Sequence, residues 1–262
     1  MQEDRAAEEL APDYNVAPTK PVYAVLTRRP DDRDRDGASR VGRNDDETAE
    51  ERQLRVLRWG LVPFWAKDVK IGSRMINARA ETVAEKPAFR RAFAGRRCLL
   101  PADGYYEWQQ QNGGPKQPIY ISRADGSSLA FAGLYELWRD ATVAPDDPSA
   151  WLWTTTIITT SAPDDLGHIH DRMPMVIDPA SWTEWLDPAN SDVSDLRSLL
   201  VPAAKSGLRT YPVSTEVNSV RNNGPHLIER VDPGLALPLV AGRTQAPKDG
   251  AAQSNAGDGA LP

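Results

Sequence analysis

The chain has 262 residues, of which 40% are hydrophobic and 8 are tryptophan, so it can bury a substantial core. No apolar stretch approaches the roughly 20 residues that cross a bilayer as a helix. The acidic start MQEDRAAEELAPDYN also lacks the apolar region of a secretory signal, so we expect a soluble, cytoplasmic protein. The net charge of -6 excludes a broadly basic nucleic-acid-binding coat, although it leaves room for a local basic patch.

Two β-branched segments near the start, 21–29 and 53–62, predict strands. The run between them, 31–51, mixes acids and bases with almost no apolar residue. Burial cannot offset the entropy of ordering such a run, and we interpret it as a mobile, charged insertion loop. Residues 86–93 (KPAFRRAF) then predict a short basic helix that begins near Pro87.

The middle and the end of the chain are dominated by strand-like segments. The predicted strands are 97–111, 117–123, 129–138, 151–160 and 208–214, and the predicted short helices are 179–186 and 193–200. The turn-forming residues Asn112, Gly113, Gly114 and Pro115 lie between the first two strands, which favours a hairpin.

No internal repeat and no change of composition is found before Pro233, after which Ala, Gly, Pro, Asp and Ser dominate. We therefore expect residues 1–232 to form one α+β domain and residues 233–262 to form a disordered tail. The predicted domain has a mixed or antiparallel, twisted, barrel-like β core with short peripheral helices.

Three polar residues lie beside strand-like or aromatic sequence, where an unpaired polar group is costly to bury: Asn77, Glu107 and His170. Each has an ordinary structural explanation. An Asn at a strand end caps or turns the backbone, a Glu between aromatics pairs with an Arg, and a His before Asp and Arg is often a satisfied structural group. An unrelated hydrolase that uses Glu107 and His170 is a further alternative.

That hydrolase alternative has little support, because no Ser lies in a nucleophile elbow. The three histidines do not form the HExxH pattern, so we expect no metal and no cofactor. The single cysteine, Cys98, lies in the predicted strand RRCLLPADG. One thiol forms neither an internal disulfide nor a cysteine-based metal cluster, and we expect Cys98 to be a small buried hydrophobe.

Eight ordered segments of the chain are more specific than any single short motif. They are YNVAPTKPV, RWGLVPFWAKD, MINARAETV, RRCLLPADGYYEW, FAGLYELW, TTIITTSA, IHDRMPMVI and PVSTEVNSVRNNGPHLI. In order and spacing they resemble the SRAP (SOS-response-associated peptidase) family, and they cover roughly residues 14–229. The resemblance implies an abasic site processing protein of the DNA damage response, which binds single-stranded DNA and crosslinks covalently to abasic sites.

The family's nucleophile, as the resemblance implies, is a cysteine directly after the initiator Met, which the protein's self-processing peptidase activity removes. The free α-amine condenses with the aldehyde of the opened sugar in a lyase-like step, and the thiol closes a thiazolidine ring. Position 2 here is Gln2, and Tyr14 lies closer to the start than in the family. Either the native protein begins upstream with Met-Cys-Gly-Arg, or this chain is a non-catalytic module that binds abasic DNA without crosslinking.

The resemblance also implies a role for each of the three polar residues. Asn77 matches the residue that helps position the reacting centre. Glu107 matches the carboxylate that moves protons as the sugar opens and the imine forms. His170 matches the residue that assists ring opening and crosslink reversal. The resemblance therefore predicts an acid/base pair formed by Glu107 and His170.

The DNA-binding residues implied by the resemblance are Arg79, Arg172, Trp65 and Pro18. The two arginines match positions that grip the phosphates flanking the lesion, and Trp65 matches an aromatic that contacts or wedges bases. Trp59 is interpreted as core. Arg90, Arg91, Arg96 and Arg97 either widen the basic patch or form a solvated face. We expect a monomer without a membrane partner, associated with the nucleoid when bound to DNA.

Overall fold

The computed structural model describes residues 9–28, 51–144, 147–162, 166, 169–200 and 207–232. The predicted tail, 233–262, and the predicted insertion loop, 31–51 apart from Glu51, lie outside the described residues. The predictions for both segments, and for the domain boundary after residue 232, therefore stay predictions. In the described part of the chain, every helix is too short or too polar to span a bilayer.

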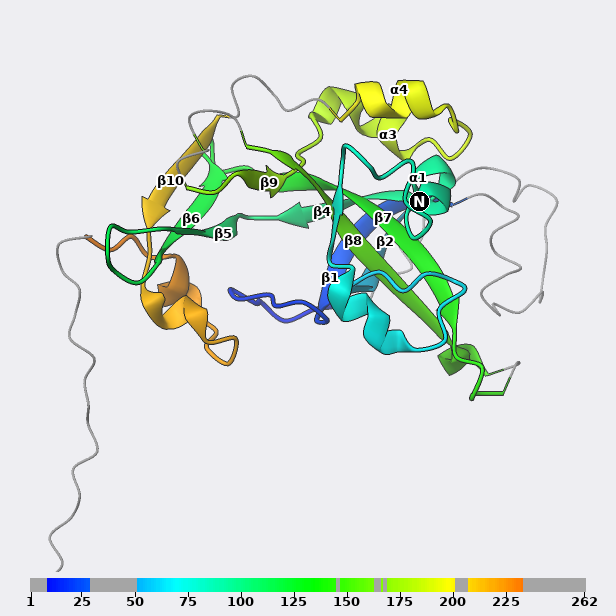
Figure 1. Cartoon of the computed structure of the whole chain (residues 1–262), viewed down its shortest axis with the longest axis horizontal. Coiled ribbons are helices and arrows are strands. Elements are labelled where there is room, and N and C mark those ends of the chain that lie inside the picture. The colour runs from blue at the N-terminus through cyan, green and yellow to red at the C-terminus, as the bar shows by residue number, and fades with distance from the viewer. Residues whose placement is uncertain are drawn as a thin grey trace, which may run out of the picture. The chain divides into compact units, whose positions relative to one another are not determined.

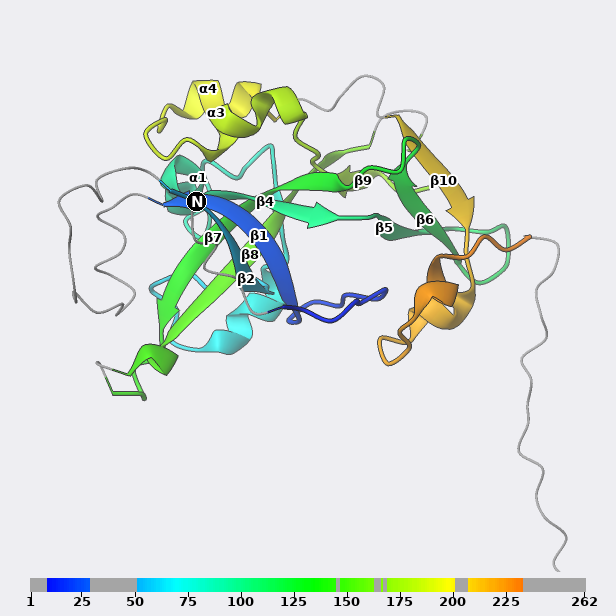
Figure 2. The same cartoon turned by 180° about the vertical axis from the view of Figure 1, so that it is seen from behind.

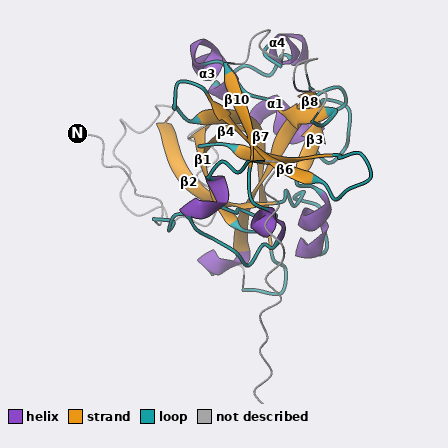
Figure 3. Ribbon diagram, turned by 90° about the vertical axis from the view of Figure 1, so that its left-hand side faces the viewer, coloured by secondary structure: helices purple, strands orange, loops and turns teal. Residues whose placement is uncertain are grey.

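Strands make up most of the described structure, with short helices around them (Figure 3). The strands are β1 (Pro21–Arg28), β2 (Glu51–Trp59), β3 (Asn77–Arg79), β4 (Arg97–Ala102), β5 (Tyr105–Gln109), β6 (Gln117–Arg123), β7 (Leu129–Arg139), β8 (Trp151–Ser161), β9 (Arg172–Pro174) and β10 (Leu208–Pro212). The α-helices are α1 (Arg90–Gly95), α3 (Trp182–Leu186) and α4 (Val193–Ser198). The 3-10 helices are η2 (Val69–Arg74), η3 (Pro148–Ala150), η4 (Pro179–Ser181), η5 (Thr215–Asn218) and η6 (Pro225–Ile228).

Five strands close into a barrel in the order β2, β1, β4, β7, β8 (Figure 1). The neighbouring strands pair antiparallel, and a parallel pairing of Arg58 and Trp59 with Thr154 and Thr155 joins β2 to β8 and closes the ring. β3 and β9 add to the two edges of β8 beyond this closure. The predicted α+β class with a mixed, barrel-like β core is confirmed.

The prediction of one strand over 97–111 is wrong, because this segment contributes to two sheets. β4 pairs with β7 as far as Ala102, opposite Leu129, where β7 begins. After Gly104 the chain continues as β5, which lies end to end with β4 but pairs with β6 (Figure 1). β5, β6 and β10 form a separate three-stranded sheet beyond the barrel (Figure 2). The predicted hairpin of β5 and β6 is present.

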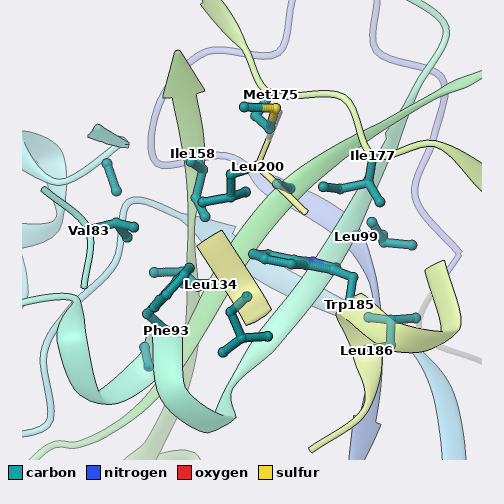
Figure 4. Packing of buried hydrophobic residues seen from close by; sticks show 14 of the residues in the cluster. Val83, Phe93, Leu99, Leu134, Ile158, Met175, Ile177, Trp185, Leu186 and Leu200 are labelled. Carbon is teal, nitrogen blue, oxygen red and sulfur yellow. The ribbon is translucent and has the colours of Figure 1, made fainter. Parts of the chain in front are cut away.

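Strand β7 is buried on both faces, because alternate residues of a strand point to opposite sides. Phe131 and Tyr135 belong to the cluster inside the barrel, whereas Leu134 belongs to the cluster that the helices cover. There Trp185 of α3 packs against Phe93 of α1, with ring centroids 6.2 Å apart (Figure 4). The helices thus bury the outer face of the barrel on this side.

The helices are shorter than predicted. Residues 86–89 form turns and α1 begins at Arg90, although Phe93 still donates its backbone N–H to the carbonyl of Phe89 at 2.8 Å. The predicted helix 179–186 divides into η4 and α3. Arg97 is 3% exposed and donates to the carbonyls of Phe93, Trp185, Asp187 and Asn190, so the interpretation of a solvated arginine face is wrong for this residue.

Candidate active site

Glu107 and His170 come from different elements and meet at the three-stranded sheet. Glu107 lies on β5 opposite Ile119, and His170 precedes β9. Glu107 Oε2 lies 4.0 Å from His170 Nδ1, and the two side chains are 21% and 43% exposed. This separation is too long for a direct hydrogen bond, but it allows both groups to contact one substrate oxygen between them. The sequence prediction of a paired acid and base matches this geometry.

The surroundings of Glu107 favour its protonated form. Burial raises the pKa of this carboxyl, the nearby carboxylate of Asp171 raises it further, and the charges of His170 and Lys116 oppose both effects. The ion-pair partner of Glu107 in the described residues is His170 rather than an arginine. A carboxyl with a raised pKa holds a proton more readily, so it can act as the acid as well as the base in a proton transfer.

The ring of His170 is oriented by its own chain. The backbone N–H of Arg172 donates to His170 Nδ1 at 3.0 Å, and Asp171 Oδ1 lies 3.3 Å from the same nitrogen. The carbonyl oxygen of Arg172 also lies 3.1 Å from Nδ1, so this nitrogen accepts from the Arg172 N–H in one tautomer and donates to the carbonyl in the other. These contacts fix the orientation of the ring and place Nδ1 on the side of Glu107.

Arg172 makes a two-pronged ion pair with Glu81, with N–O distances of 2.6 and 3.1 Å. Its Nη2 also donates to the carbonyl of Thr159 at 2.6 Å. The hydrogen bond from Arg172 lowers the pKa of Glu81, and the charge of Arg79 acts in the same direction. The carboxylate of Glu81 and the carbonyl of Thr159 on β8 thus hold Arg172 in place.

Asn77 and Arg79 are exposed on one face of β3, and Ala78 between them is buried. Thr159 of β8 pairs with Arg79 on one edge and with Pro174 of β9 on the other. The end of β8 therefore separates the strand that carries Arg79 from the strand that begins with Arg172. Sequence reasoning named both arginines but did not predict this arrangement.

The aromatic loop, which we define as residues 62–66, presents Phe64 and Trp65 at 49% and 50% exposure. Trp59 is partly buried and donates its indole N–H to the carbonyl of Ile76 at 2.9 Å, which agrees with a structural role. Pro18 is exposed, and Thr19 beside it donates its backbone N–H to the carbonyl of Trp59 at 2.8 Å.

Among the described residues, no hydrogen bond or ion pair joins Trp65 or Pro18 to Glu107 or His170. The predicted role of Trp65 and Pro18 in DNA binding stays a prediction. Sequence reasoning missed Phe64, although the sequence VPFW carries the signal, two adjacent aromatics after a proline in a predicted loop.

Cys98 lies inside the barrel and is fully buried, as expected from the sequence. Its Sγ is 3.5 Å from Thr155 Oγ1, and burial raises the pKa of the thiol to about 12. Such a thiol cannot act as a nucleophile in the folded protein. In the described ranges, no three His, Cys, Asp or Glu side chains gather as a metal site.

Residues 1–220 match the family model described as SOS response associated peptidase (SRAP). The chain belongs to the SRAP family. It is 42% identical to the abasic site processing protein YoqW of Bacillus subtilis over 222 residues, which cover 84% of this chain and 87% of that protein. It is also 33% identical to the abasic site processing protein HMCES of Gallus gallus over 253 residues, covering 88% and 69% of the two chains.

Solved structures share the SRAP fold seen here. A crystal structure of a protein from Bacteroides thetaiotaomicron matches with a TM-score of 0.61 at 31% identity, over 68% of this chain and 77% of that chain. A second crystal structure, from Bordetella bronchiseptica, matches with a TM-score of 0.58 at 26% identity, over 82% and 94%. The family predicted from the eight sequence motifs is confirmed.

Proposed function

We propose that this SRAP protein binds single-stranded DNA at abasic sites and that Glu107 and His170 move the protons that open the abasic sugar. The observation that carries the proposal is the 4.0 Å approach of Glu107 to His170, with the pKa of the carboxyl raised by burial. The names of the relatives, abasic site processing proteins, support the choice of substrate.

Opening an abasic sugar needs one proton removed and one proton supplied. A base takes the proton of the hydroxyl on C1′, the bond from C1′ to the ring oxygen breaks, and an acid protonates that oxygen to leave an aldehyde and a new hydroxyl. Glu107 and His170 share these two proton transfers, because one of them can act as the base at the C1′ hydroxyl while the other acts as the acid at the ring oxygen. Asn77 helps position the sugar, as in the family pattern.

The affinity for DNA comes from a local surface, because the whole chain is acidic. Arg79 and Arg172 bind phosphates on the two sides of the end of β8. Trp65 stacks on bases beside the lesion, a contact worth about 1–3 kcal/mol per base, and Pro18 contributes an apolar surface. Single-stranded DNA fits this surface because unpaired bases are free to stack.

The thiazolidine step requires a cysteine that offers its free α-amine and its thiol together. Position 2 is Gln2, and the only cysteine, Cys98, is buried in the barrel. We propose that Gln2 and the buried Cys98 cannot make this ring, and that a variant engineered to begin with cysteine forms the crosslink at an abasic site. Both forms use the same Glu107–His170 pair.

The test uses single-stranded oligonucleotides that are intact or carry one abasic site, with affinity measured by anisotropy and crosslinking by denaturing gel. We expect tighter binding to the abasic strand, no stable shifted band with the printed chain, and a band with a chain that begins with cysteine. Glu107→Gln should slow formation of that band and leave binding intact. The matched control is Glu85→Gln, an exposed acid that pairs with Arg197 on α4.

Three results would contradict parts of the proposal. Equal affinity for intact and abasic strands removes abasic-site recognition. A stable band from the printed chain means that it contains a nucleophile after all. An unchanged crosslinking rate in Glu107→Gln, with the control also unchanged, makes the carboxylate structural.

A further inference from the structure

Two adjacent large aromatics in the aromatic loop face solvent although the residues just before them are fully buried. Leu61 and Val62 are 0% exposed, whereas Phe64 and Trp65 are about half exposed. Arg91 of α1 lies over the Phe64 ring, 4.4 Å from its centroid. Exposed aromatics on a fixed loop are typical of an interaction surface rather than of a core.

Three hydrogen bonds from the barrel wall fix the backbone of this loop. The N–H of Val62 donates to Thr154 Oγ1 at 2.9 Å. The N–H of Phe64 donates to Glu136 Oε2 at 3.2 Å. The indole of Trp138 donates to the carbonyl of Ala66 at 2.7 Å. The loop is thus bound before, within and after its exposed aromatics.

Glu136 is the unusual member of this set because it is a charged group inside the protein. Its side chain is 3% exposed, and its second oxygen pairs with Arg96. On β7 it alternates with Tyr135 and Leu137, which face the barrel interior, so it points outward together with Trp138. A buried carboxylate is costly unless it is paired and hydrogen-bonded, and here one of its bonds goes to the loop.

We propose that Glu136, assisted by Trp138, is a positioning residue that holds Phe64 and Trp65 as a fixed stacking surface for the bases beside an abasic site. This inference rests on the proposed function. A loop ordered before binding loses less entropy when bases stack on it, so a rigid loop binds DNA more tightly. The FAGLYELW motif acquires a role in this way, since its Glu136 and Trp138 are the two loop supports.

The sign of the effect separates positioning from simple electrostatics. Removing a negative charge from a DNA-binding protein strengthens its attraction for phosphates. If Glu136 acts only through its charge, replacing it tightens binding. If it positions the loop, replacing it weakens binding.

The test measures affinity for an abasic oligonucleotide that carries 2-aminopurine beside the lesion, whose fluorescence reports stacking. We expect Glu136→Ala and Trp65→Ala each to weaken binding about tenfold and to reduce the stacking signal. Glu136→Gln, which keeps an oxygen acceptor for Phe64, should restore most of the affinity. In the Trp65→Ala background, Glu136→Ala should add less than about twofold, because residues that act through one group are not additive. Glu85→Ala is the control with the same charge change.

The inference is overturned if Glu136→Ala folds and binds DNA as tightly as the unchanged protein. It is also overturned if Glu136→Ala weakens binding as much in the Trp65→Ala background as it does alone. If Glu136→Ala fails to fold, Trp138→Phe decides, because it removes only the bond to Ala66 and should still weaken binding several-fold. If the unchanged protein binds intact and abasic strands equally, the proposed recognition of abasic sites is wrong, but the inference about the loop can still be tested. The same variants are then compared by their affinity for the intact strand. If the unchanged protein binds no DNA at all, both proposals are overturned.

Discussion

Glu81 forms an ion pair with Arg172, one of the two arginines proposed to bind phosphates, and its removal gives the sharpest prediction about DNA binding. Arg172 is joined to Glu81 at 2.6 and 3.1 Å, so a phosphate at Arg172 must displace this carboxylate or lie beside it. Because the hydrogen bond from Arg172 lowers the pKa of Glu81, the carboxylate is charged at neutral pH. We therefore expect Glu81→Gln to bind DNA more tightly than the unchanged protein.

The size of the effect follows from Coulomb's law. Two unit charges about 4 Å apart interact by about 1 kcal/mol in water and about 4 kcal/mol at an effective dielectric constant near 20. The side chains of Arg172 and Glu81 are 21% and 49% exposed, which favours the lower figure. A gain of about 1 kcal/mol corresponds to about fivefold tighter binding. The loss of a partly exposed ion pair should lower the free energy of unfolding by less than about 1 kcal/mol.

The assay is fluorescence anisotropy with single-stranded abasic DNA over a series of salt concentrations. Freeing one cation for phosphate should steepen the plot of log affinity against log salt by up to about 0.7. Glu85→Gln makes the same substitution in an exposed pair with Arg197 and should change neither quantity as much. Weaker binding by Glu81→Gln would refute the competition and show that Glu81 orients Arg172. An unchanged affinity and slope would remove Arg172 from the interface.

Three further predictions concern stability and reactivity. Because burial raises the pKa of Glu107, the folded protein retains a proton that the unfolded chain releases, so its stability falls as the pH rises above the ordinary value of 4.5. Glu107→Gln lacks this loss, and its melting temperature relative to that of the unchanged protein should increase between pH 4 and pH 7. A constant difference in melting temperature would argue against the raised pKa. Cys98, with its thiol pKa of about 12, should react with Ellman's reagent only after unfolding, and reaction in the native state would show that the barrel opens. Gly133→Ala should lower the free energy of unfolding in denaturant melts by about 1–3 kcal/mol, because the added Cβ would lie 2.2 Å from Leu100 Cδ1. Gly95→Ala is the control, because a Cβ at that position meets nothing within 4 Å. Equal stabilities for the two alanine variants would mean that the barrel interior adjusts freely.

The strands were predictable because β-branched residues and alternation report locally on a pleated, half-buried surface. The division of 97–111 was not, because the point where β4 leaves the barrel depends on where β7 begins, far along the chain. Pairing across β8 likewise places Arg79 and Arg172 on its two edges. Periodicity within one segment contains no information about such partners.

The polar residues show the same limit. Glu107 and His170 were proposed from their chemistry and from the family resemblance, and the structure brings them within 4.0 Å. Glu136 was overlooked, although a lone acid in the apolar run LAFAGLYELW has to find a partner when the strand is buried. For Arg97 the sequence left open a basic patch or a solvated face, and its burial was missed because its acceptors are backbone carbonyls near α3, which no side-chain pattern reveals.

Closure of the barrel by β8 has a consequence for the order of folding during synthesis. β2 joins β8 across a long separation in the chain, and contacts of this kind form late because the intervening chain must first be ordered. β3 and β9, which carry or begin with Asn77, Arg79 and Arg172, also need β8 as a partner. A nascent chain that ends before Ser161 therefore has an open sheet edge, and the surface formed by Asn77, Arg79 and Arg172 is not yet assembled. We expect such incomplete chains to aggregate more readily than the closed barrel, because an unpaired strand edge can pair with another chain.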